Sequence, residues 1–115
     1  MNMASVRTDM VRLLSLEGTA DATLLGRLDA IIGGVVQALS LRIGGADVPD
    51  SLSYIVRDVS LARYNRIGSE GAASHNVEGE SISYAGVDDF APFARDIELW
   101  VEANAATRVR KVHFL

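Results

Sequence analysis

Apolar side chains recur at the spacing of an α-helix in four segments of the chain. The first segment, residues 5–16, places Val6 and Met10 on one face. Ser5 is the expected N-cap, because its hydroxyl can accept a hydrogen bond from a free backbone N–H. Gly18 can end the helix in a left-handed turn.

The second segment, residues 20–43, is the longest and follows the pattern of an amphipathic helix. Its apolar positions are Leu24, Leu25, Leu28, Ile31, Ile32, Val35, Val36 and Leu39. Thr19 or Asp21 can cap its start, and Gly44–Gly45 can end it. The pair Gly33–Gly34 in the middle costs about 1 kcal/mol per residue relative to alanine, so we expect close approach by another helix or a slight bend there.

A third helix is predicted to begin near residues 49–51 and to end with Gly68 as its C-terminal cap. Its buried stripe consists of Leu52, Ile55, Val56, Val59 and Ala62. A fourth helix is predicted over residues 89–103, with Asp88 or Asp89 as cap and Pro92 in the first turn. Its apolar face consists of Phe90, Phe93, Ile97, Trp100 and Val101.

Two segments fall outside these helices. Residues 69–87 form a long connection in which Val77, Ile82 and Tyr84 alternate with polar residues, which indicates an irregular β-hairpin-like excursion. Residues 104–115 have strand-like residues and predict an extended C-terminal arm, with a frayed terminus as the alternative. We therefore predict an all-α fold, a small antiparallel four-helix bundle over residues 1–103 that carries the loop excursion and is followed by this arm.

Length and composition limit the possible classes of protein. A chain of 115 residues fits one domain, and an apolar share of 49% is sufficient for a core. The chain has no cysteine, which excludes disulfides and thiolate sites. No signal peptide is visible, and the longest nearly apolar stretch, residues 30–41, is short for a bilayer span. We expect synthesis in the cytoplasm and no membrane partner.

Charge is unevenly distributed along the chain, whose net charge is −4. Between residues 68 and 90 all charged residues are acids: Glu70, Glu78, Glu80, Asp88 and Asp89. Between residues 103 and 115 all charged residues are bases: Arg108, Arg110 and Lys111. Opposite charges on two segments favour head-to-tail contact between copies, although both segments could simply be solvated.

Candidate catalytic and metal-binding residues do not form a convincing site. His75 lies in the long loop and His113 near the terminus, so neither is placed to act as a general base. Glu78 and Glu80 lie in a polar turn, where nothing desolvates them. The pair Asp88–Asp89 could bind a cation weakly, but helix capping is the better interpretation. We expect no enzymatic activity, no cofactor and no metal.

Binding to DNA is the alternative function that four helices leave open. The best candidate recognition helix of a helix-turn-helix regulator spans residues 50–67 and carries Arg57, Arg63 and Arg66. A pI near 5 and the absence of a larger basic face argue against it.

A specific motif begins where the third helix ends. The run Ala62-Arg63-Tyr64-Asn65-Arg66-Ile67-Gly68-Ser69-Glu70-Gly71 is followed by Asn76-Val77-Glu78-Gly79-Glu80-Ser81-Ile82-Ser83-Tyr84 and then by Asp88-Asp89-Phe90. This order resembles the head–tail connector, or adaptor, proteins of long-tailed bacteriophages, especially those of Gram-positive hosts. The pair His75-Asn76 departs from the usual small or charged pair without affecting any role.

The resemblance implies a structural virion protein in the phage neck. Such proteins form a ring, usually of twelve copies, beneath the portal, and a stopper or head-closure protein attaches on the tail side. The genome passes through the lumen during ejection without sequence-specific contact, and no enzymatic activity is expected.

The resemblance also assigns hypothetical roles to two groups of residues. Contacts with the lumen or with a neighbouring subunit are expected from Arg63, Tyr64, Arg66, Glu70, Glu78, Glu80 and Tyr84. Of these, Arg63 and Arg66 are expected to pair with Glu70 or with acids of the adjacent copy. Docking onto the portal or a neighbour is expected from Arg108, Val109, Arg110, Lys111, Val112, His113 and Phe114.

Overall fold

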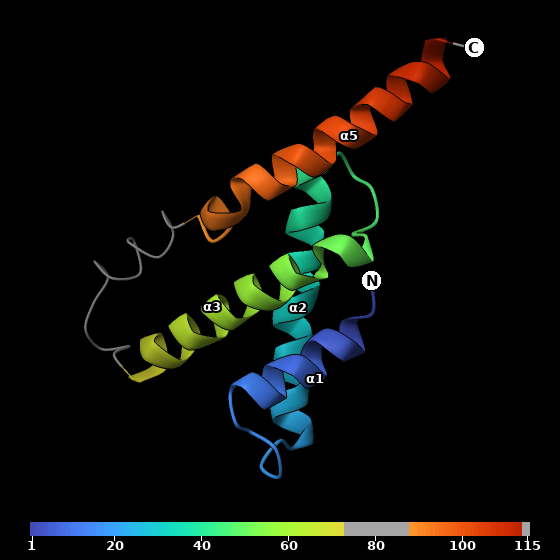
Figure 1. The fold of residues 1–115 in the computed structure, drawn as a ribbon. Coiled ribbons are helices and arrows are strands. Elements are labelled where there is room, and N and C mark those ends of the chain that lie inside the picture. Colours follow the sequence, from blue (N-terminus) through green and yellow to red (C-terminus); the bar gives the residue numbers. More distant parts are fainter. Residues whose placement is uncertain (73–87, 114–115) are drawn as a thin grey trace.

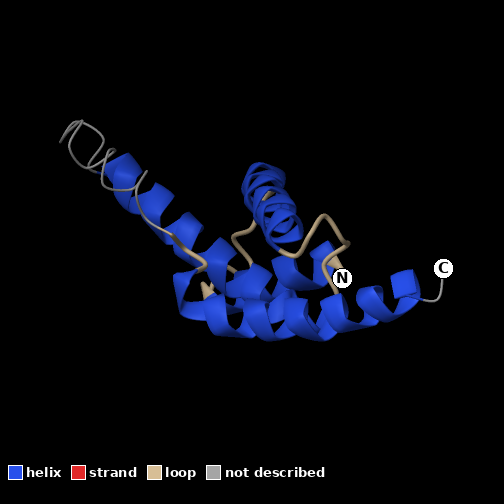
Figure 2. Ribbon diagram, turned by 90° about the horizontal axis from the view of Figure 1, so that it is seen from above, coloured by secondary structure: helices blue, strands red, loops and turns tan. Residues whose placement is uncertain are grey.

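The computed structural model describes residues 1–72 and 88–113, with side chains for residues 1–67 and 88–105. These residues form four α-helices, namely α1 (Met3–Leu13), α2 (Ala22–Arg42), α3 (Ser53–Ala72) and α5 (Ala94–His113) (Figure 1). Two short 3₁₀ helices precede α3 and α5, namely η1 (Asp50–Leu52) and η3 (Ala91–Phe93). No strand occurs among the described residues (Figure 2), and the predicted all-α class is confirmed.

The four helices do not all lie side by side. In Figure 1, α2 crosses behind α1, α3 and α5, and the view from above in Figure 2 shows it nearly end-on. The predicted antiparallel order holds for α3 and α5, which run in opposite directions. Because α2 contacts both α1 and α3, and these two also contact each other, the three helices form the centre of the fold.

The first helix begins and ends earlier than predicted. The side chain of Asn2, rather than Ser5, accepts the hydrogen bonds of the first turn, from the N–H groups of Ala4 (2.9 Å) and Ser5 (3.2 Å). The helix ends at Leu13, after which Ser15 adopts a φ of 56°. An asparagine three residues before the predicted cap satisfies the first free N–H groups, which moves the whole helix toward the N-terminus.

The second helix closely matches its prediction. Asp21 Oδ1 accepts a hydrogen bond from the Leu24 N–H at 2.8 Å, and Gly44 and Gly45 end the helix with φ values of 88° and 86°. Gly33 and Gly34 face side chains of α1 and α3 at ordinary van der Waals distance, which is wider than the close approach that the sequence predicts. A Cβ placed on Gly33 would lie 3.8 Å from the Met3 side chain of α1, and one on Gly34 would lie 3.8 Å from the Arg63 guanidinium of α3.

The third and fourth helices both continue beyond their predicted ends. Gly68 does not cap α3, which runs on to Ala72 and so includes the first residues of the predicted loop. Pro92 lies in the first turn as predicted, but α5 continues to His113, so the extended conformation predicted for the C-terminal arm is wrong. Alanines at 103, 105 and 106 and the basic residues after them favour a helix and offer no breaker. The rest of the predicted hairpin, residues 73–87, lies outside the described residues.

One cluster of buried side chains joins the helices. Its members, each less than 9% exposed, are Val6, Met10, Leu28, Ile32, Val35, Leu39, Ile43, Val48, Leu52, Ile55, Val56, Val59, Phe90 and Ile97. Half of them come from α2 and the first half of α3. Only Phe90 and Ile97 come from the chain after residue 88, so α5 is attached to the core mainly through its first two turns.

The second helix is long and apolar enough, by length and composition, to cross a membrane. The apolar stretch 30–41, on which the sequence-based prediction rested, is short for a bilayer span, whereas the complete helix α2 is long enough. Within this fold, α2 buries Leu28, Ile32 and Val35 against its neighbours. Its Asp29 forms an ion pair with Arg7 of α1 at 2.9 Å. These contacts are those of a central core helix, and the absence of a membrane partner stays a prediction.

The molecule is flat and elongated. Its principal extents are 57 × 35 × 18 Å, and its radius of gyration is 16.8 Å. A compact domain of this length would have a radius of gyration of about 13 Å. The C-terminal part of α5 projects well beyond the other helices (Figure 1). The accessible surface is 7345 Å², about a fifth more than the roughly 6,100 Å² of a compact monomer of this mass.

Candidate functional site

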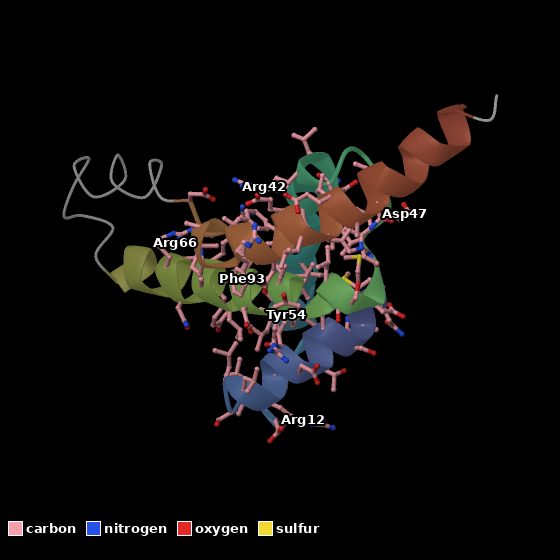
Figure 3. All side chains as sticks on the ribbon, turned by 45° about the horizontal axis from the view of Figure 1, so that its top comes forward. Arg12, Arg42, Asp47, Tyr54, Arg66 and Phe93 are labelled. Carbon is pink, nitrogen blue, oxygen red and sulfur yellow. The ribbon has the colours of Figure 1, made fainter. Side chains whose placement is uncertain are left out.

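Two arginines of α3 hold the segment that leads into α5. Arg66 contacts both carboxylate oxygens of Asp89, with nitrogen–oxygen distances of 2.6 and 2.5 Å. Arg63 Nε lies 3.4 Å from Asp89 Oδ2. The Asp89 side chain is only 7% exposed, so this pair is largely shielded from water. Figure 3 shows Arg66 between α3 and the start of η3.

A third arginine holds the neighbouring residues to the end of α2. Arg42 Nη2 lies 3.0 Å from Asp88 Oδ1, and its guanidinium lies 4.6 Å from the centre of the Phe90 ring. The Phe90 N–H donates to Asp88 Oδ1 at 3.0 Å, so the Asp88 side chain also closes a turn immediately before η3. We call Arg42, Arg63, Arg66, Asp88 and Asp89 the arginine clamp.

The clamp changes the ionisation of Asp89. Hydrogen bonds from Arg66 lower the pKa of this carboxyl below its usual value, and the Arg63 guanidinium acts in the same direction. Burial opposes the shift without reversing it. Asp89 therefore stays ionised in the fold, and its charge is neutralised by the two arginines.

A second attachment joins α5 to the start of α3. The Tyr54 hydroxyl donates a hydrogen bond to the Asp96 carboxylate, and this bond raises the pKa of Tyr54 above its usual value. The Tyr54 and Phe93 rings meet edge to face, with centroids 6.1 Å apart (Figure 3). Together with the clamp, these contacts fix the direction in which α5 leaves the body.

The structure brings together part of the predicted contact residues. Arg63 and Arg66 lie side by side in the clamp, and Tyr64 is partly buried against the core. The sequence predicted Asp89 only as a candidate helix cap. Its contact with Arg66 spans 23 residues, and such a long-range pair leaves no signal in the local sequence. Glu70, Glu78, Glu80 and Tyr84 have side chains outside the described residues. The same holds for the side chains from Arg108 to Phe114, of which the backbone is helical as far as His113.

The arginines proposed for DNA contact all have acidic partners within the chain. Arg57 Nε lies 2.9 Å from Asp58 Oδ1, while Arg63 and Arg66 are engaged by Asp89. An arginine that is already paired offers less charge to phosphates. This geometry disfavours the helix-turn-helix alternative.

A shallow hollow of about 290 Å³ lies between α1 and the start of α3. It is lined by Asn2, Ser5, Val6, Asp9, Asp50, Ser53, Tyr54 and Arg57. This set contains neither a histidine nor a cysteine that could activate a nucleophile. Among the residues with described positions, no group of three His, Asp or Glu side chains could hold a metal ion.

The fold and its contacts define a small helical structural module with paired charges at the base of its last helix. Residues 14–100 match the family of Phage gp6-like head-tail connector proteins. The chain belongs to this family, which is structural and implies a place at the neck of the virion. Searches of curated proteins and of solved structures found no significant match.

Proposed function

We propose that the chain forms a ring of twelve copies between the portal and a tail-side stopper protein, with the genome passing through its lumen without sequence-specific binding. The observation that carries this proposal is the family match over residues 14–100. The flat body and the projecting α5 support it, because they leave large surfaces for neighbouring proteins. The ring acts as an assembly element and catalyses no reaction.

The acidic segment is proposed to face the lumen or the adjacent copy. Asp88 and Asp89 are neutralised by arginines of the same chain, so Glu70, Glu78 and Glu80 carry the remaining negative charge of this segment. Negative charge repels DNA phosphates, and attraction to phosphates is what makes DNA binding strong. Tyr84 belongs to the same contact surface. Arg63, Tyr64 and Arg66 act at its base, where they fix the two ends of the segment.

The C-terminal residues are proposed to dock onto the portal or a neighbouring copy. The relevant residues are Arg108, Val109, Arg110, Lys111, Val112, His113 and Phe114. Because α5 continues through His113, the docking element is a helix rather than an added strand. The C-terminal part of this helix projects beyond the other helices (Figure 1), and an isolated helical segment of that length is marginally stable in water. A partner surface would supply the missing contacts.

Binding to the portal tests the proposed function. The purified chain is mixed with portal rings of the same phage, and co-sedimentation is measured with and without excess duplex DNA. We expect the chain to sediment with the portal and DNA to show no salt-dependent mobility shift. Binding to DNA without binding to the portal would contradict the proposal and support the alternative, a DNA-binding regulator of the helix-turn-helix type.

A truncation tests the docking helix separately. A chain ending at Ala106 keeps the described core and the clamp, since these involve residues up to Val101. We expect it to retain the helical circular-dichroism signal of the body and to lose portal docking. Docking that is unchanged in reconstituted particles would show that residues 107–115 are not the docking element.

A further inference from the structure

The buried core is divided unevenly between the two described parts of the chain. Of the buried apolar side chains that the structure describes, all except Phe90 and Ile97 lie between Val6 and Val59. The helices that carry them, α1, α2 and α3, also contact one another directly. We call these three helices the body. Most of the core is therefore formed without α5.

The last helix buries little apolar surface against the body. The side chains that are only partly buried against the core are Phe93, Trp100 and Val101. The other side of α5 is exposed, and its exposed residues include Arg95, Glu98, Leu99 and Glu102. Beyond these residues the helix projects past its neighbours (Figure 1). Helices in proteins are stabilised mainly by the packing of one face, so α5 depends on a short attachment near its start.

Charged contacts complete this attachment. The arginine clamp joins residues 88 and 89 to α2 and α3, and the Tyr54 hydroxyl joins Asp96 to the start of α3. In the pair of Arg42 with Asp88 the two side chains are 44% and 50% exposed, so water and salt weaken it. The Asp89 side chain is 7% exposed. Asp89 is therefore the charged group on which the attachment depends most.

We propose that residues 88–113 form a latched arm, which detaches reversibly while the body stays folded, with Asp89 as the latch. Detachment ends the burial of Phe90 and Ile97 but leaves the larger core of the body in place. An element with few buried apolar contacts opens at a lower free energy than the core unfolds. Elements that move when a protein binds a partner are drawn from such units. The arm does not depend on the proposed ring.

Hydrogen exchange of the full-length chain in its native state tests the arm. Exchange of backbone amides is followed by mass spectrometry at neutral pH, in urea concentrations below the global unfolding transition. We expect the amides of residues 97–104 to be protected at least about 100-fold less than those in the middle of α2. They should also share one protection factor and one urea dependence, because the arm opens as a unit and exposes surface when it does so.

The chain contains one tryptophan, which gives an independent optical measurement. Trp100 lies on the arm and is half-buried against the core, so its fluorescence reports detachment. The far-ultraviolet circular dichroism comes mainly from the helices of the body. We expect the fluorescence transition at a lower urea concentration than the circular-dichroism transition, since two units that open separately do not give coincident transitions.

Two matched substitutions test the latch. Asp89→Asn should lower the protection of residues 97–104 by about thirtyfold or more, because it removes a nearly buried charge from its two arginines. Asp88→Asn makes the same change in an exposed pair and should lower this protection by less than about fivefold.

The opposing results are distinct. Equal protection of residues 97–104 and α2, with coincident optical transitions, would overturn the arm, because the chain would then unfold as one unit. Protection that falls steadily along α5 without dependence on urea would also overturn it, because this is the behaviour of a helix that frays from its end. Equal effects of the two substitutions would overturn the assignment of Asp89 as the latch.

Discussion

Replacing Asp89 by asparagine changes few atoms but should clearly lower the stability of the fold. Asp89→Asn keeps the shape of the side chain and one acceptor oxygen, but removes the negative charge that Arg63 and Arg66 face. Both guanidinium groups would then keep their positive charges close together, with no carboxylate between them. The substitution therefore tests whether the arginine clamp stabilises the attachment of α5.

The magnitude follows from the burial of the three groups. Removing one partner of a fully buried ion pair costs about 3–5 kcal/mol. Here Asp89 is nearly buried, whereas the side chains of Arg66 and Arg63 are 21% and 33% exposed, so water can partly solvate them. We therefore expect a loss of about 2–3 kcal/mol, below the fully buried case. For a domain of this size, the melting temperature should fall by roughly 10 °C.

Asp88→Asn is the matched control. It is the same substitution at the neighbouring residue, where the pair with Arg42 is exposed on both sides. Exposed pairs contribute about 0–1 kcal/mol, and asparagine can still accept the Phe90 N–H bond. Urea unfolding of both variants at neutral pH gives the comparison. Equal losses for the two variants, or a loss below about 1 kcal/mol for Asp89→Asn, would refute the role assigned to the clamp.

Three further predictions concern stability. The pKa of Asp89 is lowered in the fold, so the ionised carboxylate stabilises the fold fully above the unfolded pKa of about 3.9, and this contribution is lost as the pH falls through the folded pKa. The difference in unfolding free energy between wild type and Asp89→Asn, measured by urea unfolding, should therefore be constant from about pH 7 to 5 and shrink below about pH 4. A difference that grows in acid would contradict this sign. Ser60 is fully buried and its hydroxyl has no hydrogen-bond partner among the described residues. Ser60→Ala should therefore raise the unfolding free energy by up to about 1 kcal/mol, and a clear loss would reveal a hidden partner. Gly45→Ala should lower the unfolding free energy by about 1 kcal/mol because the φ angle of Gly45 is 86°. Gly26→Ala should raise it by a similar amount, because Gly26 lies inside α2 with open space around it. Thermal melts that show the same sign for both variants would be inconsistent with these conformations.

Local signals predicted the parts of the fold that depend on neighbouring residues. The apolar period of residues 20–43, Asp21 as a cap and the glycines at 44–45 together defined α2 almost to its ends. The ends of α3 and α5 were harder, since Gly68 allows a helix to continue as well as to stop, and alanines after residue 103 favour continuation. The valines near the terminus favour a strand, but the helix that precedes them continues through them.

Long-range contacts were not predictable from the pattern. Arg66 and Asp89 lie near the two ends of the family motif, and nothing in their local sequence shows that they pair. The same holds for Tyr54 and Asp96, whose contact depends on α5 lying across the start of α3. The motif identified the family, while the tertiary structure was needed to show that its arginines hold the fold together.

The most direct test of the connector role is cryo-electron microscopy of the neck in assembled phage particles. We expect a ring beneath the portal into which residues 1–72 and 88–113 fit as a repeated subunit, with α5 extending toward a neighbouring protein. A neck without this chain, or a ring of an unrelated fold in that position, would contradict the assignment.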